Sequence, residues 1–285
     1  MKCPICETSI KHLIKVIDDI SVYQCDSCYA AILKNDRESI KENKQWYSFK
    51  EYQAEEKRLE KRLKKIAKII VRYKKKGELL DIGAGFGHLS SILNKLGRFQ
   101  INLVEPLVKP KYLLDKNITL HKTDYEHFLS KQKFDLVLMV DVIEHFQNPV
   151  RNLLRTKKIL KKRGYLMIQT PNYKSLMAKI CRNWSWWMPQ DHKLLFSIRS
   201  IKNILETSGF QRVFLMTYED FHDFKKNLDG NFVGIKNKLL KKLSKGVFLT
   251  LFIPIYFLFR QIIWRLGYGG LIFLVAKRYN NNDGK

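Results

Sequence analysis

A glycine-rich turn is the first part of the chain whose residue types could do chemistry. Residues 78–82 form a short apolar stretch typical of a strand, and Gly83, Gly85 and Gly87 follow before a predicted helix. Such a turn lets a ligand approach the backbone and the helix N-terminus closely. Asp81 precedes the first glycine, and its carboxylate would repel a pyrophosphate but attract a ligand that carries an ammonium group. The turn therefore favours a positively charged ligand over a dinucleotide.

The elements around this turn alternate between strands and helices. Further strands are expected at residues 101–104, 118–120, 134–140, 164–169, 213–217 and 270–276, and helices between them include 150–160 and 198–208. The stretch 134–140 is almost entirely apolar, as a parallel strand buried on both faces should be. This alternation predicts an α/β fold with a Rossmann-like, doubly wound sheet of seven strands.

Several motifs in this order resemble the class I S-adenosylmethionine-dependent methyltransferases. Residues 79–87 look like motif I of that family, 141–145 like the segment after its fourth strand, and 160–168 like the step into its fifth. The match covers about residues 47–217, and the last predicted strand extends it to about 277. The methyl donor of this family carries both an ammonium and a sulfonium group. The resemblance therefore agrees with the charge preference of the turn.

The resemblance implies a set of donor-binding residues. Glu105, at the end of the second strand, matches the acidic residue that takes the two ribose hydroxyls, and Asp124 with Tyr125 matches the pair that reads the adenine edge. Ala84 stands where a cysteine or serine is frequent, which is a conservative departure. The predicted cofactor-binding residues are Asp81, Gly83, Gly85, Gly87, Glu105, Asp124, Tyr125 and Asp141.

The segment after the fifth strand bears on the acceptor. Residues 170–172, 191–192 and 196–197 are similar to small-molecule methyltransferases akin to the ubiquinone-pathway type. That similarity implies a saccharide or a lipid-linked or quinone-type acceptor. Methyl transfer from a sulfonium is an in-line displacement, so a base is needed only if the acceptor carries a proton of high pKa. We predict His145 and His192 as candidate catalytic bases, although either histidine could instead hydrogen-bond a loop or pack at an edge.

Four of the five cysteines fall in two Cys-x-x-Cys pairs near the N-terminus, Cys3 with Cys6 and Cys25 with Cys28. Two such pairs bring four thiolates into the tetrahedron of a closed structural zinc site. Zinc would also hold together a segment too short to bury its own core. A vestigial ribbon or a redox pair would use the same spacing. Cys181 is expected to be a buried structural thiol.

The chain is predicted to divide into three parts: a zinc-ribbon-like module at 1–34, a helical lead-in at 35–76, and a methyltransferase domain at 77–279 with an apolar insertion at 230–267. Lysines precede the apolar run of the insertion, which Pro254 interrupts. If the last strand returns to the same sheet, the insertion must dip into a membrane and return, or lie flat on it. An interfacial anchor fits this composition. Buried helices or a dimer interface would also use such a segment.

The formal net charge of +26, from 53 Lys and Arg against 27 Asp and Glu, favours anionic partners. An anionic membrane surface is one such partner, and the chain is then cytoplasmic and attached to the inner face of the membrane. RNA is the alternative, since a zinc ribbon and a basic surface would also serve an RNA methyltransferase. A third interpretation is a donor-binding scaffold without catalysis. The oligomeric state cannot be predicted from these features.

Overall fold

The computed structural model describes residues 1–17, 19–34, 49–107, 117–181, 183–232 and 235–279. The chain forms two compact units, and each is assembled from separate stretches of the sequence. The first unit comprises Met1–Asp36, Thr170–Ile201 and Leu215–Phe273. The second unit comprises Arg37–Gln169, Lys202–Phe214 and Leu274–Lys285.

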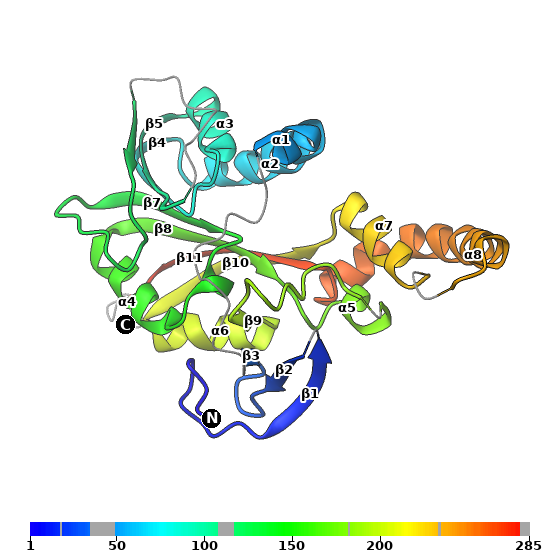
Figure 1. The fold of residues 1–285 in the computed structure, drawn as a ribbon. Coiled ribbons are helices and arrows are strands. Elements are labelled where there is room, and N and C mark those ends of the chain that lie inside the picture. Colours follow the sequence, from blue (N-terminus) through cyan, green and yellow to red (C-terminus); the bar gives the residue numbers. More distant parts are fainter. Residues whose placement is uncertain (18, 35–48, 108–116, 182, 233–234, 280–285) are drawn as a thin grey trace. The chain divides into compact units, whose positions relative to one another are not determined.

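The second unit is built on a seven-stranded sheet of order β10-β11-β8-β7-β4-β5-β6 (Figure 1). Its strands are β4 (Lys76–Ile82), β5 (Arg98–Val104), β6 (Ile118–His121), β7 (Phe134–Val140), β8 (Leu160–Pro171), β10 (Phe210–Tyr218) and β11 (Leu271–Arg278), of which the last three run on into the first unit. The pairs β4–β5, β4–β7, β5–β6 and β7–β8 are parallel. The predicted fold class is confirmed.

Helices cover both faces of this sheet (Figure 1). They are α1 (Phe49–Ala54), α2 (Glu56–Tyr73), α3 (His88–Leu96), α4 (Pro149–Ile159) and α6 (Ile198–Thr207), with a short 3-10 turn η1 (Ile143–His145). Helix α2 is amphipathic and buries Leu63, Ile66, Ala67 and Ile70, because these residues recur at helical spacing on one face. Asn148 caps α4 by accepting from the Arg151 N–H at 2.9 Å.

The first unit contains a four-stranded sheet of order β1-β2-β3-β9. Its strands β1 (His12–Ile17), β2 (Ile20–Gln24) and β3 (Ala31–Lys34) form an antiparallel meander, and β9 (Leu194–Leu195) pairs with β3. The predicted zinc-ribbon-like module at 1–34 thus forms three strands of this sheet, and β9, from a distant part of the sequence, completes it.

The apolar insertion forms helices α7 (Phe221–Gly230) and α8 (Lys238–Arg265), and a short helix α5 (Leu176–Ile180) contacts α7. Pro254 lies inside α8 without ending it. Tyr256 of α8 stacks on Phe224 of α7 with ring centroids 4.2 Å apart. The insertion is thus one long helix that packs along a shorter one.

Candidate active site

The order of the strands places the candidate site. From β4 the chain moves outward to β5 and β6, and then returns to the other side of β4 at β7. The loop after β4 therefore leads toward β5, and the loop after β7 leads the opposite way, toward β8. Loops that diverge in this way leave a crevice between them at the carboxyl ends of the two strands. Ligands of doubly wound sheets bind in this crevice. The glycine turn that follows β4 and the loop at Asp141 that follows β7 both lie at this edge.

Asp81 is buried near the end of β4, with 3% of its surface exposed. Ser90 of α3 donates a hydrogen bond from Oγ to Asp81 Oδ2 at 2.6 Å. Burial raises the pKa of Asp81 to about 7, because the charged form is poorly solvated there, and the negative charge of Glu105 adds to the rise despite the opposing Ser90 hydrogen bond. A cationic ligand nearby would reverse this effect by favouring the carboxylate.

The three glycines of the turn all adopt a left-handed backbone, with φ of 65° at Gly83, 54° at Gly85 and 81° at Gly87. Residues with a Cβ rarely adopt this conformation. A Cβ added at Gly83 would also lie 2.6 Å from Val142 Cγ2 in the neighbouring loop. Gly87 is the N-cap of α3, so the turn directs the positive end of that helix toward the crevice.

Glu105 connects two loops at the same edge. Its Oε2 accepts a hydrogen bond from the Gly85 N–H at 2.9 Å, and its Oε1 accepts one from the Leu107 N–H at 2.9 Å. The carboxylate is therefore held by the glycine turn on one side and by its own loop on the other. Its role as the ribose ligand stays a prediction.

Asp124 and Tyr125 have different surroundings. Half of the Asp124 side chain is exposed, and it pairs with His127, whose Nδ1 lies 2.7 Å from both carboxylate oxygens. Tyr125 is buried, and its hydroxyl lies 2.8 Å from Thr156 Oγ1 of α4. Burial raises the pKa of Tyr125 to about 12. Asp124 is thus the more accessible of the two predicted adenine contacts.

Asp141 has a positive φ of 57°, which is uncommon for a residue with a Cβ and points to a constrained functional loop. Gln169 of β8 donates from Nε2 to Asp141 Oδ1 at 2.8 Å, and Arg62 Nη2 lies 3.7 Å from Oδ2. The Asp141 side chain is 23% exposed. Sequence reasoning missed Gln169 and Arg62, since nothing local links either of them to Asp141.

The two predicted bases belong to different compact units. His145 ends η1 in the second unit and is half-buried. His192 is buried in the first unit, and its Nδ1 lies 3.0 Å from the Trp186 carbonyl oxygen. Because a carbonyl only accepts, Nδ1 must carry the proton, which in the neutral imidazole leaves Nε2 as the acceptor atom. Catalysis by either histidine stays a prediction.

Tyr52 of α1 lies near the glycine turn, where its ring packs on the ring of Phe86 with centroids 4.8 Å apart.

The four N-terminal cysteines gather in the first unit. The Sγ atoms of Cys3, Cys6, Cys25 and Cys28 all lie within 4.8 Å of one another. The two knuckles share one geometry, because the residue after each pair, Glu7 or Tyr29, has a φ of 59°. The Cys28 hydrogen bond lowers the pKa of the Cys3 thiol to about 5. The cluster is compatible with a zinc knuckle.

The cluster is attached to the rest of its unit by contacts that sequence reasoning did not foresee. The Tyr173 hydroxyl donates to the Tyr29 carbonyl oxygen at 2.9 Å, and Ser197 Oγ donates to the same oxygen at 2.8 Å. Arg199 lies over the Tyr29 ring at 4.4 Å. The knuckle residue Tyr29 therefore anchors the 173–199 segment.

Comparison with known proteins agrees with this geometry. Residues 49–214, more than half of the chain, match the family model described as a methyltransferase domain. The chain is 24% identical over 184 residues to the ubiquinone biosynthesis O-methyltransferase of Bartonella quintana, covering 55% of this chain and 71% of that protein. The corresponding enzyme of Rickettsia bellii is 28% identical over 102 residues, covering 33% and 42%. The match thus spans less than half of the latter protein.

Among solved structures, an S-adenosylmethionine-dependent methyltransferase from Archaeoglobus fulgidus superposes with a TM-score of 0.54 at 21% identity, covering 80% of this chain and 99% of that one. This likeness shows the shared fold. Together with the family match and the strand order around the glycine turn, it identifies the chain as a member of the S-adenosylmethionine-dependent methyltransferases.

Proposed function

We propose that this enzyme methylates a small molecule at a membrane surface, namely a saccharide or a lipid-linked or quinone-type intermediate. The names of its relatives support a small-molecule acceptor, since they include ubiquinone biosynthesis O-methyltransferases. The bound donor supplies an electrophilic methyl group on its sulfonium. The chain's own residues then align the two reactants, and His145 or His192 removes the acceptor proton where the acceptor has one.

An exposed apolar stripe on α8 carries the membrane part of this proposal. Its residues are Leu240, Leu243, Val247, Leu251, Ile255, Leu258 and Ile262, each between 53% and 74% exposed. They recur every three or four positions, so they share one face of the helix. The face that packs on α7 is a different one, where Phe252 and Tyr256 stack on Phe224. A continuous apolar face of this length marks an interaction site.

Among the described residues, α8 is long and apolar enough to cross a membrane, with a mean hydropathy of 1.8 over its most apolar window and 6% of that window buried. Topology favours a helix that lies in the interface instead. The strands that flank the insertion, β10 and β11, are neighbours in one sheet, so both ends of the insertion return to the same side. Lysines 238, 241 and 242 and the C-terminal Arg265 flank the apolar stretch and would meet anionic headgroups, whereas Lys245 pairs with Asp229 of α7 at 2.7 Å.

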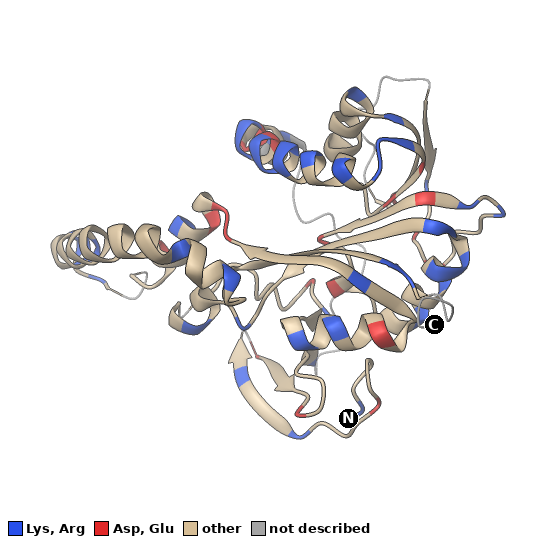
Figure 2. Cartoon of the chain, turned by 180° about the vertical axis from the view of Figure 1, so that it is seen from behind, with Lys and Arg blue, Asp and Glu red and all other residues tan. Residues whose placement is uncertain are grey.

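Lysines and arginines also occur on many other elements, with a dense row along α2 (Figure 2). This distribution keeps RNA as the competing partner, and the α8 stripe supports the membrane proposal because RNA offers no apolar surface of that length. Peripheral attachment to the inner face of the membrane follows as part of the proposal.

Flotation with phosphatidylcholine–phosphatidylglycerol vesicles tests the membrane part. Leu251→Glu and Leu258→Glu should each reduce vesicle binding at least about tenfold, because each removes one leucine's burial and adds a charge. Leu129→Glu is the matched control, since Leu129 is 88% exposed on a loop of the second unit. Unchanged binding in both α8 variants would refute the membrane assignment.

Label transfer tests the acceptor class. The enzyme is incubated with methyl-labelled S-adenosylmethionine and the lipid, saccharide and RNA fractions of a cell extract. We expect label in the lipid or saccharide fraction, with His145→Gln or His192→Gln lowering transfer while S-adenosylhomocysteine still binds. Label found in RNA alone would refute the small-molecule assignment.

We also propose that Cys3, Cys6, Cys25 and Cys28 bind one structural zinc ion. All four positions of a tetrahedron are supplied by thiolates, and Sγ separations of 3.5 Å for Cys3–Cys28 and Cys6–Cys25 suit Zn–S bonds of about 2.3 Å. With four protein ligands no coordination position is open for substrate, so the ion would stabilise the fold. Metal analysis of the purified protein should find one zinc per chain.

A further inference from the structure

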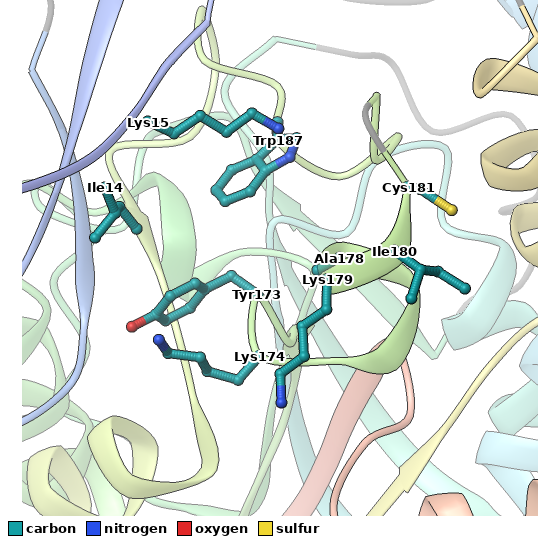
Figure 3. Close-up of a pocket in the computed structure, with 9 residues that line it drawn as sticks. All are labelled: Ile14, Lys15, Tyr173, Lys174, Ala178, Lys179, Ile180, Cys181 and Trp187. Atoms are coloured by element: carbon teal, nitrogen blue, oxygen red, sulfur yellow. The ribbon is translucent and has the colours of Figure 1, made fainter.

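A pocket of about 450 Å³ lies entirely within the first compact unit. Its walls come from β1, from the 173–181 segment and from Trp187 (Figure 3). This volume is in the range of small-molecule sites. Neither the donor site nor the zinc cluster uses it, because the donor-site residues belong to the second unit and none of the four cysteines lines the pocket.

Three lysines line this pocket, and among the residues that the structure describes no carboxylate lines it. Lys15 and Trp187 lie on one side, and Lys174 and Lys179 on the opposite side (Figure 3). Burial lowers the pKa of Lys174, and the positive charge of Lys179 lowers it further. The pocket therefore concentrates positive charge that an anion would neutralise.

Aromatic rings lie beside all three ammonium groups. Lys15 Nζ lies 4.9 Å from the centroid of the Trp187 ring, and Lys179 Nζ lies 4.4 Å from that of Tyr268. Lys174 Nζ is 5.0 Å from the Tyr173 ring, and it donates a hydrogen bond to Gln24 Oε1. A ring attracts a cation through its quadrupole and carries no charge of its own, so the ring contacts do not cancel the charges of Lys174 and Lys179.

The N-terminal module at residues 1–34, here called the ribbon, forms part of this pocket and supports its opposite wall. The pairing of β1 with β2 is irregular between Leu13 and Lys15, and at such a bulge two successive side chains can face the same side. Ile14 and Lys15 both line the pocket as a result. On the other wall, Tyr173 is fixed by its hydrogen bond to the Tyr29 carbonyl oxygen of the ribbon. The pocket is thus a built feature of the unit.

We propose that this pocket binds the phosphate or diphosphate group of the acceptor, an inference that rests on the proposed small-molecule function. Lysines bind phosphate groups as point charges, and a phosphate with two negative charges is attracted by them more strongly than a carboxylate with one. The ammonium groups of Lys174 and Lys179 at this cavity suit an anion that carries about two charges. Ile14 and Trp187 supply apolar surface for the organic part next to the phosphate.

Isothermal titration with inorganic pyrophosphate at constant ionic strength tests the pocket. We expect wild-type binding, and Lys174→Gln and Lys179→Gln should each weaken it at least about tenfold, because each removes a charge-assisted contact. Lys162→Gln is the matched control, since Lys162 is exposed in the second unit and the change removes the same charge. Absent binding, or an equal loss in the control, would overturn the proposal.

Vesicles distinguish the source of the phosphate. A preference for phosphatidylcholine vesicles doped with phosphatidic acid over vesicles doped with phosphatidylglycerol, abolished by Lys174→Gln, identifies a lipid phosphate. Pyrophosphate binding without that preference identifies a soluble phosphorylated acceptor. S-adenosylhomocysteine binding and thermal stability, measured on every variant, show whether a variant is folded. Label transfer to RNA alone would refute the proposed function and leave the pyrophosphate result standing.

Discussion

Binding of the methyl donor should release a proton from Asp81 at mildly acidic pH. Without ligand, burial and the charge of Glu105 hold the pKa of Asp81 at about 7, so the carboxyl group is largely protonated below that pH. The ammonium and sulfonium of the donor favour the charged carboxylate. The ligand must therefore displace the proton before it gains the full attraction.

The size of this effect follows from the pKa. One pH unit below the pKa, about nine in ten molecules are protonated, so the affinity should fall about tenfold, or roughly 1.4 kcal/mol. Above about pH 7.5 the affinity should become constant. The free energy of unfolding of the unliganded protein changes with pH in the opposite direction. The folded pKa of Asp81 lies above the unfolded value of about 3.9, so the protonated carboxyl group contributes its full stability below about pH 3.9. This contribution is lost as the pH rises through about 7.

Isothermal titration with S-adenosylhomocysteine, in buffers of different ionisation enthalpy, measures both the affinity and the protons released. Asp81→Asn should bind more weakly at neutral pH and lose the pH dependence, and it should raise the stability of the unliganded protein above pH 7. Asp135→Asn is the control, because lysines 161 and 74 and the Glu78 N–H keep the pKa of Asp135 low, so it does not titrate in this range. A wild-type affinity that is the same at about pH 6 and pH 7.5 would refute the reasoning.

Three further predictions concern single positions. Gly83→Ala should lower the free energy of unfolding by about 2 kcal/mol or more, because it adds a clash to a left-handed backbone. Gly246→Ala is the control: the glycine lies in α8 with open space around it, so alanine should raise the free energy of unfolding by up to about 1 kcal/mol. Chemical denaturation measures both changes. Cys28→Ser should lose bound zinc and lower the melting temperature, as should a chelator, while Cys181→Ser keeps the metal. Glu105→Gln should weaken S-adenosylhomocysteine binding about tenfold or more, measured by titration.

The strand, glycine turn and helix around Asp81 were predictable because their signals are local. A strand, a turn and a helix follow one another within residues 76–96, and the left-handed glycines are encoded where they occur. The residues that support this site were not predictable. Ser90 bonds Asp81 across a turn, and Gln169 reaches Asp141 from a neighbouring strand, so each contact depends on tertiary packing.

For the apolar insertion, the sequence indicated the composition but not the way the helices pack. Its apolar composition and lysine flank were visible in the sequence, but periodicity alone did not separate one long helix from two short ones. Stacking of α7 on α8 determines which face of α8 is covered. The exposed stripe could be defined only after that partner was known.

The first unit combines the cysteine cluster that we propose binds zinc, a lysine-lined pocket and an exposed apolar helix, and each alone has several interpretations. Within one unit they constrain one another. Tyr29 of the N-terminal module holds Tyr173 in the pocket wall, so a bound metal would have a structural task. A phosphate in the pocket and an α8 that lies in a membrane interface would together suit an acceptor with an anionic head and an apolar body. RNA would satisfy the lysines but leave the α8 stripe in water. A soluble sugar phosphate would fill the pocket and equally leave that stripe unused. A phosphorylated, membrane-borne acceptor, as we propose, would use both the pocket and the stripe.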